Sequence, residues 1–241
     1  MRNALLLGLM LAAATASAYE LKRDRDGDVV RWSGGVTFVI DPKLDEKLGA
    51  PGATEAVKAA ISTWSSAMPN VELSAAVGDI EQAYSTITVI ERDWPYDDGV
   101  MAVTILKVDY ANDRIVEADI VFNGAQHHFK VLPADSTRGG AFADVQNTVT
   151  HELGHAIGLQ HDTVLEEAVM YPMAYHGEVN KRALSSDEIA GLDALYPLTE
   201  LASPVGCSAS GSAVPAAVAA VLMLALARRR QPRELNPKRI G

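Results

Sequence analysis

Alternating apolar and polar positions in the first half of the chain predict β-strands. The segment Val36–Ile40 alternates and is followed by Asp41-Pro42, which favours a strand that ends in a turn. Similar patterns predict strands near residues 71–75, 85–90, 100–106 and 115–122. Between the first two strands, apolar residues recur at helical spacing up to Trp64, so Thr54–Ala67 is expected to be an amphipathic helix with Thr54 as N-cap. From Phe142 onward the pattern is helical, so strands and helices are largely segregated along the chain.

The first 18 residues have the pattern of a cleavable export signal. Arg2 supplies a positive start, residues 4–14 are apolar without a charge, and Ala16-Ser17-Ala18 is a small-x-small cleavage pattern. A membrane-spanning helix needs about 20 apolar residues, and this run is shorter. We therefore expect export, with Tyr19 as the first residue of the mature protein. The alternative, a buried N-terminal helix, would require a second, polar face that the segment lacks.

The other end of the chain predicts a sorting segment. A spacer over residues 199–212 precedes the uncharged run Ala213–Ala227 and the cluster Arg228–Arg230. Fifteen helical residues cover roughly 22 Å, which is shorter than the hydrocarbon core of a membrane. The arginine cluster directly after this run is typical of the positively charged residues that stop translocation on the cytoplasmic side. The tail resembles the MYXO-CTERM class of bacterial surface-sorting signals, with Gly206-Cys207-Ser208 before the apolar run. The resemblance implies processing near Cys207 and a hydrophobic anchor over 213–241; an amphipathic helix on the domain is the alternative.

The charge of the central part of the chain limits the kinds of partner that it can bind. The full chain has 21 basic and 31 acidic residues. Without the leader and the tail, residues 19–206 keep 14 basic and 30 acidic residues, a net charge of −16. This charge disfavours nucleic acid, and it leaves membrane contact to the tail alone. We expect a monomer, with carboxylates to spare for Ca²⁺ at sites that the sequence does not indicate.

Three histidines close together are the strongest sign of chemistry. His151 and His155 are one helical turn apart, so both imidazoles project from one face and can share a zinc ion. Glu152, beside them, is suited to hold and deprotonate a water at that metal. A helix with two surface histidines is the plainer interpretation of this short motif.

The third histidine decides between these interpretations. On a continuous helix, His161 would point away from His155, so it can reach the same metal only if the chain reverses between them. Gly158 stands where a left-handed residue would allow the reversal. Three neutral histidines leave one tetrahedral position open, as catalytic zinc requires. Met170 is placed to pack beneath such a site, or simply to fill the core.

The pattern H-E-x-x-H-x-x-G-x-x-H followed by a methionine turn resembles the metzincin metalloproteases. Within them the chain is most similar to the matrixins, which are the catalytic domains of matrix metalloproteases and include bacterial members. The resemblance is carried by the zinc motif, Val169-Met170-Tyr171-Pro172, a closing helix from Ser185 and the Arg31-Trp32 start. It implies a catalytic domain over 31–198 with an α+β, zincin-like fold: a twisted mixed five-stranded sheet with about three helices, one carrying the zinc motif.

The resemblance also implies roles for single residues. His151, His155 and His161 would bind catalytic zinc, and Glu152 would act as general base and then as acid to the leaving amine. Met170 would form the methionine turn. Met101 and Ala102 would belong to the edge strand that pairs with an extended peptide, while Pro172 and Met173 would begin the outer wall of the S1′ pocket. The implied activity is that of a secreted or surface-anchored zinc endopeptidase.

Other interpretations stay open at this point. A surface-displayed zinc module that binds without cleaving would need no base at Glu152, and a zinc hydrolase of non-peptide bonds would need no edge strand. Residues 19–30 are expected to be a solvated arm, with a cation site or an inhibitory segment whose aspartates reach the zinc as the alternatives. His127 and His128 are expected to be solvated, with a second metal as the alternative.

Overall fold

The computed structural model describes residues 18–197, and the structural statements below concern this part of the chain. Most of the export signal, the spacer and the sorting tail lie outside the described residues. Within residues 18–197, no helix combines the length and the apolar character needed to cross a membrane.

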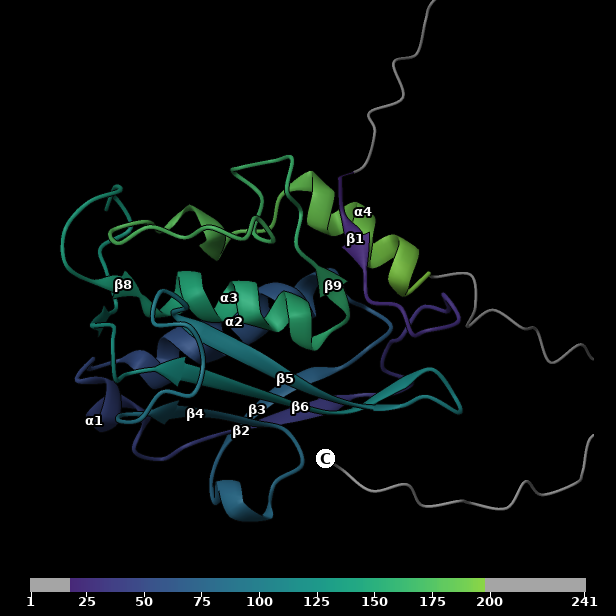
Figure 1. Ribbon diagram of the computed structural model, residues 1–241, viewed down its shortest axis with the longest axis horizontal. Coiled ribbons are helices and arrows are strands. Elements are labelled where there is room, and N and C mark those ends of the chain that lie inside the picture. The colour runs from purple at the N-terminus through teal and green to yellow at the C-terminus, as the bar shows by residue number, and fades with distance from the viewer. Residues whose placement is uncertain (1–17, 198–241) are drawn as a thin grey trace, which may run out of the picture. The chain divides into compact units, whose positions relative to one another are not determined.

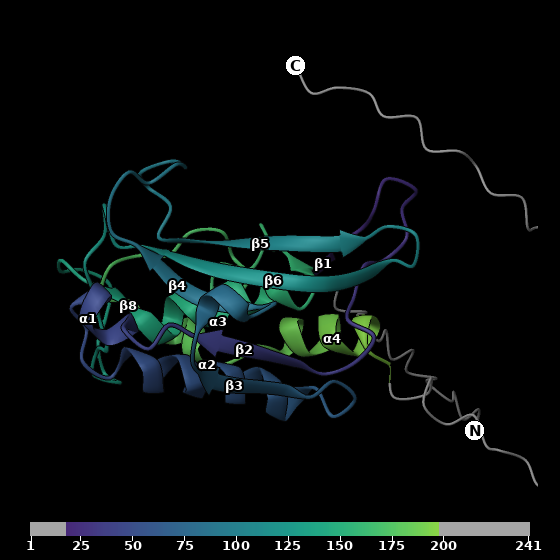
Figure 2. The ribbon, with the colours of Figure 1, turned by 90° about the horizontal axis from the view of Figure 1, so that it is seen from below.

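A five-stranded mixed sheet forms one layer of the fold. Its strands stand in the order β3-β2-β4-β6-β5, so β3 and β5 are the two edges (Figure 2). All neighbouring pairs are parallel except β5 and β6, which are antiparallel. The strands of this sheet are β2 (Val36–Ile40), β3 (Leu73–Val77), β4 (Thr86–Ile90), β5 (Ala102–Asp109) and β6 (Arg114–Asn123).

The two long helices α2 and α3 lie on the same side of this sheet and pack against each other (Figure 1). The helix α4 lies farther along the molecule, beside the short strand β1. The α-helices are α1 (Leu44–Leu48), α2 (Ala53–Ala67), α3 (Val145–Ala156) and α4 (Ser186–Leu195). Short elements complete the fold: β1 (Glu20–Leu21), η1 (Ile80–Gln82), β7 (Phe129–Lys130), β8 (Ala143–Asp144), β9 (Leu159–Gln160) and η2 (Asn180–Arg182).

The core lies between the sheet and the two helices. In β2, Val36 and Phe38 are buried while Thr37 between them is exposed, as the alternation predicts. From α2, Trp64 is fully buried, and its indole N–H donates to the carbonyl of Thr150 in α3 at 2.8 Å. This hydrogen bond satisfies the one polar atom of the largest core side chain. The expected α+β architecture with a mixed five-stranded sheet is confirmed.

Two details of the helices differ from the expectation. The residues described contain four α-helices rather than about three, because Leu44–Leu48 forms the short α1. The longer helix begins at Ala53, with Gly52 rather than Thr54 as its N-cap. The physical reason is Asp45, whose carboxylate accepts hydrogen bonds from the backbone of Gly52 and from both the backbone and the hydroxyl of Thr54. The Thr54 side chain therefore ties the two helices together instead of capping one.

The N-terminal arm is docked at its start. Strand β1 pairs antiparallel with β9, which directly follows α3. Farther on, residues 25–28 are exposed, and the carboxylate of Asp24 accepts the backbone N–H groups of Asp26 and Asp28. The expectation of a solvated arm therefore holds for the turn and for Glu20, whereas Leu21 is half-buried and its backbone is paired with β9.

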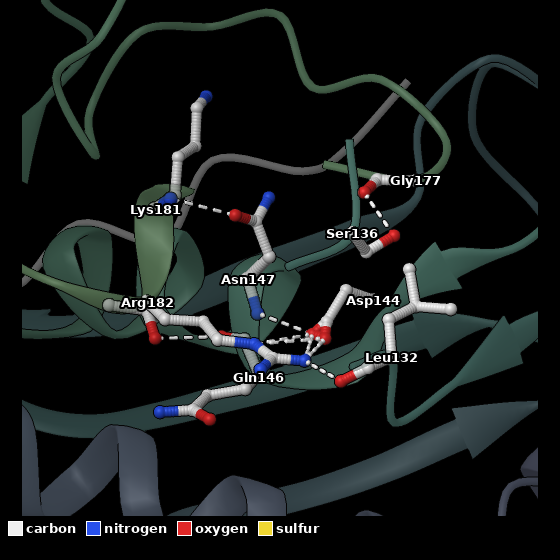
Figure 3. A network of polar contacts seen from close by, with 9 residues as sticks. Leu132, Ser136, Asp144, Gln146, Asn147, Gly177, Lys181 and Arg182 are labelled. Atoms are coloured by element: carbon white, nitrogen blue, oxygen red, sulfur yellow. Dashed lines mark hydrogen bonds and ion pairs between the residues drawn. The ribbon is translucent and has the colours of Figure 1, made fainter. Parts of the chain in front are cut away.

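A buried ion pair fastens η2 to the start of α3 (Figure 3). Asp144 is the N-cap of α3, and its side chain is fully buried. Both carboxylate oxygens accept hydrogen bonds from the guanidinium of Arg182, and Nη2 of Arg182 also donates to the carbonyl of Leu132 at 2.7 Å. Next to this pair, Asn147 Oδ1 accepts the backbone N–H of Lys181 at 2.8 Å.

Breaking this pair from one side should be costly. Replacing Arg182 by Met leaves the carboxylate of Asp144 buried without its cation, so we expect the free energy of unfolding to fall by about 3–5 kcal/mol in chemical denaturation. The double variant Arg182→Met with Asp144→Asn should recover a substantial part of that loss. As a control, Lys107→Met removes an exposed pair with Glu117 and should change stability by less than about 1 kcal/mol. Equal effects of Arg182→Met and Lys107→Met would contradict this account.

Candidate metal centre and cleft

The three histidines of the zinc motif meet at one point. His151 and His155 lie on α3, and His161 follows β9, after the chain has reversed. The Nε2 atom of His161 lies 3.3 Å from that of His151 and 3.1 Å from that of His155. Three nitrogens bound tetrahedrally to zinc at about 2.0–2.1 Å would be roughly 3.3–3.4 Å apart. The spacing therefore fits a single zinc ion.

Hydrogen bonds prepare two of the imidazoles for a metal. Nδ1 of His151 lies 2.6 Å from the carbonyl of Val169, and Nδ1 of His155 lies 3.0 Å from the carbonyl of Leu159. A carbonyl only accepts, so each Nδ1 must carry the proton and each Nε2 presents a lone pair. Two such lone pairs converge beside a third imidazole nitrogen, an arrangement that a cation stabilises. Neutral imidazole nitrogens are also a donor set that suits zinc.

Burial keeps these imidazoles neutral. It lowers the pKa of His151 well below its ordinary value and that of His155 to about 4. The pKa of His161 is also lowered, mainly by burial and further by the nearby Lys181. Neutral histidines at physiological pH are the form that binds metals.

The end of α3 is built to reverse the chain. Gly158 has a φ of +108°, and the following residues turn back as β9. A helix end exposes carbonyl groups that need partners. Here the indole N–H of Trp32 donates to Ala156, and the hydroxyl of Tyr196 donates to Ile157. The backbone N–H of Lys22, from the arm, donates to Gly158 at 2.7 Å. The reversal predicted at Gly158 is thus present and fully supported by hydrogen bonds.

Met170 lies directly beneath the histidine helix. It is buried, and its sulfur occupies the space that a Cβ on Gly154 would need. Its backbone N–H donates to the carboxylate of Glu188, which also forms a capping box with Ser185 at the start of α4. Its carbonyl accepts the N–H of Asp162, the residue after the third histidine. Met170 therefore connects α3, α4 and the loop that carries His161.

Glu152 is buried at the same point, on the cleft side of α3. Burial raises the pKa of its carboxyl group to about 7, against an opposing effect of the hydroxyl of Thr104 on β5. That hydroxyl lies 2.7 Å from Oε2 of Glu152 and 3.0 Å from its backbone carbonyl. Thr104 thus orients the carboxylate, a role that the sequence analysis missed because it depends on how β5 packs on α3.

A cleft of about 720 Å³ runs past the histidines and Glu152. Met101 and Ala102 line it from the start of β5, with Met101 one residue before the strand itself. Pro172 and Met173 line it from the segment that follows Met170. The structure therefore brings the three histidines, Glu152 and the four residues expected to bind substrate to one cleft, with Met170 buried beneath α3. It adds residues that the sequence did not point to, among them Lys22, Thr148 and Lys181.

Of the remaining histidines, His128 is exposed as expected, but His127 is half-buried. The ring of His127 lies 5.8 Å from that of His176, and its Nε2 lies 2.9 Å from the carbonyl of Asp98. Among residues 18–197, the group His151, His155 and His161 is the one cluster of three or more metal-ligating side chains close enough to share an ion. No such cluster in this part of the chain supports the alternative of a second metal at His127 and His128.

The comparison of this sequence with known proteins agrees with the metal-binding geometry described above. The profile of the matrixin family matches residues 31–197, and the chain belongs to this peptidase family. It is 28% identical over 140 residues to matrix metalloproteinase-26 of Homo sapiens, which covers 57% of this chain and 48% of that protein. It is 42% identical over 62 residues to a hatching enzyme of Paracentrotus lividus, covering 26% of this chain and 10% of the enzyme. For metalloendoproteinase 2-MMP of Arabidopsis thaliana, the identity is 39% over 56 residues, 23% of this chain and 14% of that protein. The chain thus spans between 10% and 48% of the length of these curated relatives.

The reversal can be tested at Gly158. In Gly158→Ala the new Cβ would lie 2.8 Å from the carbonyl oxygen of Val30, and alanine rarely adopts this φ. We expect the free energy of unfolding to fall by about 1–3 kcal/mol and zinc affinity to fall about 10–100-fold, measured by denaturation and by competition with a chelator. Gly34→Ala, which has open space around its Cβ, is the matched control. Unchanged zinc affinity in Gly158→Ala would show that the reversal does not hold His161 in place.

Proposed function

We propose that this protein is an exported zinc-dependent endopeptidase that cleaves extended peptide or protein chains. The observation that carries the proposal is the convergence of three imidazole nitrogens beside the buried carboxyl group of Glu152, in a cleft bordered by a sheet edge. Membership of the matrixin peptidase family supports the same conclusion.

His151, His155 and His161, which line the cleft beside Glu152, would hold the metal. Zinc, when bound there, would supply a Lewis acid that polarises a water molecule and the substrate carbonyl. Glu152 takes a proton from the attacking water and later delivers it to the leaving nitrogen. A carboxyl group with a pKa near 7 suits both steps, and the hydroxyl of Thr104 keeps it aimed at the cleft.

The edge strand β5 provides the means to bind an extended chain. In the described sheet, β5 pairs with β6 alone, so the backbone groups on its other side are free to pair with a substrate. We assign Met101 and Ala102 to this substrate-binding edge and Pro172 with Met173 to the facing wall. Regular backbone pairing selects extended peptide over compact substrates of other kinds, which favours peptide bonds over the non-peptide alternative.

The proposed place of action rests on the composition of residues 1–18 and 213–241. The signal-like residues 1–18 would direct export, and the tail over 213–241, with processing near Cys207, would hold the protein at the cell surface. The acidic domain itself has no affinity for anionic membranes in this proposal, so the tail would be its connection to the surface. We propose that the domain acts as a monomer.

Replacing Glu152 by Gln separates catalysis from metal binding. The amide keeps the size of the side chain but cannot take the proton, so kcat on casein or a fluorogenic peptide should fall by about 10²–10⁴-fold. Zinc content, measured by elemental analysis, should stay the same as in the parent. Glu46→Gln changes an exposed carboxylate in α1 and should leave both quantities unchanged.

The alternative function is a surface-displayed zinc module that binds its target without turnover. It predicts zinc in the parent and in Glu152→Gln but no hydrolysis of any substrate by either protein. Turnover in Glu152→Gln at the rate of the parent would instead refute the role given to this residue.

A further inference from the structure

Lys181 is a buried cation in the wall of the cleft. It lies on η2, is 1% exposed, and lines the same cavity as Glu152 and Thr148 of α3. Its backbone is fixed by Asn147, and its side chain extends away from the polar network at the start of α3 (Figure 3). The facing wall is the segment Pro172–Ala174. Lys181 therefore lies in the part of the cleft between α3 and the segment Pro172–Ala174, which we call the recess.

The ammonium group of Lys181 has neutral partners. Its Nζ donates to the carbonyl of Tyr171 at 2.5 Å and to that of Met173 at 2.8 Å. No carboxylate oxygen in residues 18–197 lies within 4.0 Å of it. An ammonium has three N–H donors, so the two carbonyls leave one without an assigned acceptor. A buried charge without a counter-ion is costly, and an anion at this point would lower that cost.

The surrounding carboxylates do not supply this anion. Glu188 is occupied by Met170 and Ser185, and Glu178 accepts the N–H of Tyr175 and lies 3.6 Å from Arg138. The charges of these two carboxylates and of Glu152 raise the pKa of Lys181 only through longer-range electrostatic attraction. The charge of Arg138 has the opposite effect on this pKa. Burial is the largest effect and lowers the pKa of Lys181 to about 8, so the side chain still carries its charge at pH 7.

We propose that Lys181 is a specificity-determining residue that receives an acidic substrate side chain, glutamate above leucine, at the position directly after the scissile bond (P1′). This inference rests on the proposed peptidase function. A chain paired with β5 and centred on the three histidines places that side chain in the recess between α3 and Pro172–Ala174, where its carboxylate accepts the remaining N–H of Lys181. The substrate class is thus proteins with exposed, extended segments that carry glutamate.

A purely structural role makes a different prediction. By bonding to Tyr171 and Met173, Lys181 also holds the wall in place, so its loss could slow the cleavage of every substrate alike. The ratio between two substrates that differ only at P1′ cancels such a general loss. Specificity, rather than activity, is therefore the quantity to measure.

The test uses the zinc-loaded full-length protein and peptides that are identical except for Glu, Gln or Leu at P1′. The parent should cleave the Glu peptide with a kcat/KM at least about tenfold above that of the Leu peptide, as expected for a charge-assisted hydrogen bond. Lys181→Met, which keeps the length and loses the charge, should reverse this order, and Lys181→Arg should preserve it. Lys58→Met, on the outer side of α2, is the matched control. A peptide with Glu on the other side of the scissile bond should show no dependence on Lys181.

Two results would overturn the inference: a parent that prefers Leu to Glu, or the same Glu-to-Leu ratio in the parent and in Lys181→Met. If the parent cleaves no peptide and no casein, it is the proposed function that fails. In that case calorimetric binding of the Glu and Leu peptides decides the inference by itself. Tighter binding of the Glu peptide that is lost in Lys181→Met would support it, and equal binding of the two peptides would overturn it.

Discussion

The structure depends on how α3 ends. A helix can present two histidines to one metal, but the third must come from chain that has turned back, and Gly158 makes that turn possible. The turn exposes three successive carbonyls, at Ala156, Ile157 and Gly158, which water could otherwise compete for. The side chains of Trp32 and Tyr196, from the two ends of the domain, and the backbone N–H of Lys22 donate hydrogen bonds to these three carbonyls. The candidate metal centre therefore involves segments from Lys22 to Tyr196 rather than one motif.

Buried polar groups connect the centre to its supports. Asp144 and Arg182 join the start of α3 to η2, and Glu188 joins the start of α4 to Met170. Asp162, fully buried after the third histidine, accepts the N–H groups of Val164 and Leu165 and so closes the loop. Each of these carboxylates has its partners supplied by backbone or by a cation, which a buried charge requires. The wall and the helix between which the substrate would lie are fixed by the same contacts.

Features that rest on local spacing could be predicted from the sequence. The histidine spacing, the glycine at the reversal, the helix that starts after Ser185 and the alternation in β2 all depend on neighbours within a few residues. Lys181 and Thr104 could not be found in this way, because their burial beside Glu152 arises from packing between distant segments. The pairing of β1 with β9 was missed for the same reason. A two-residue strand carries no periodic signal.

The central claim is that three histidines hold one zinc ion with a fourth position open to the cleft. The most direct measurement is a crystal structure of the zinc-loaded protein with anomalous diffraction at the zinc edge. The account predicts one ion bound by Nε2 of His151, His155 and His161 at about 2.0–2.1 Å, with solvent as the fourth ligand beside Glu152. A fourth protein side chain that closes the coordination, or an ion bound elsewhere, would contradict it.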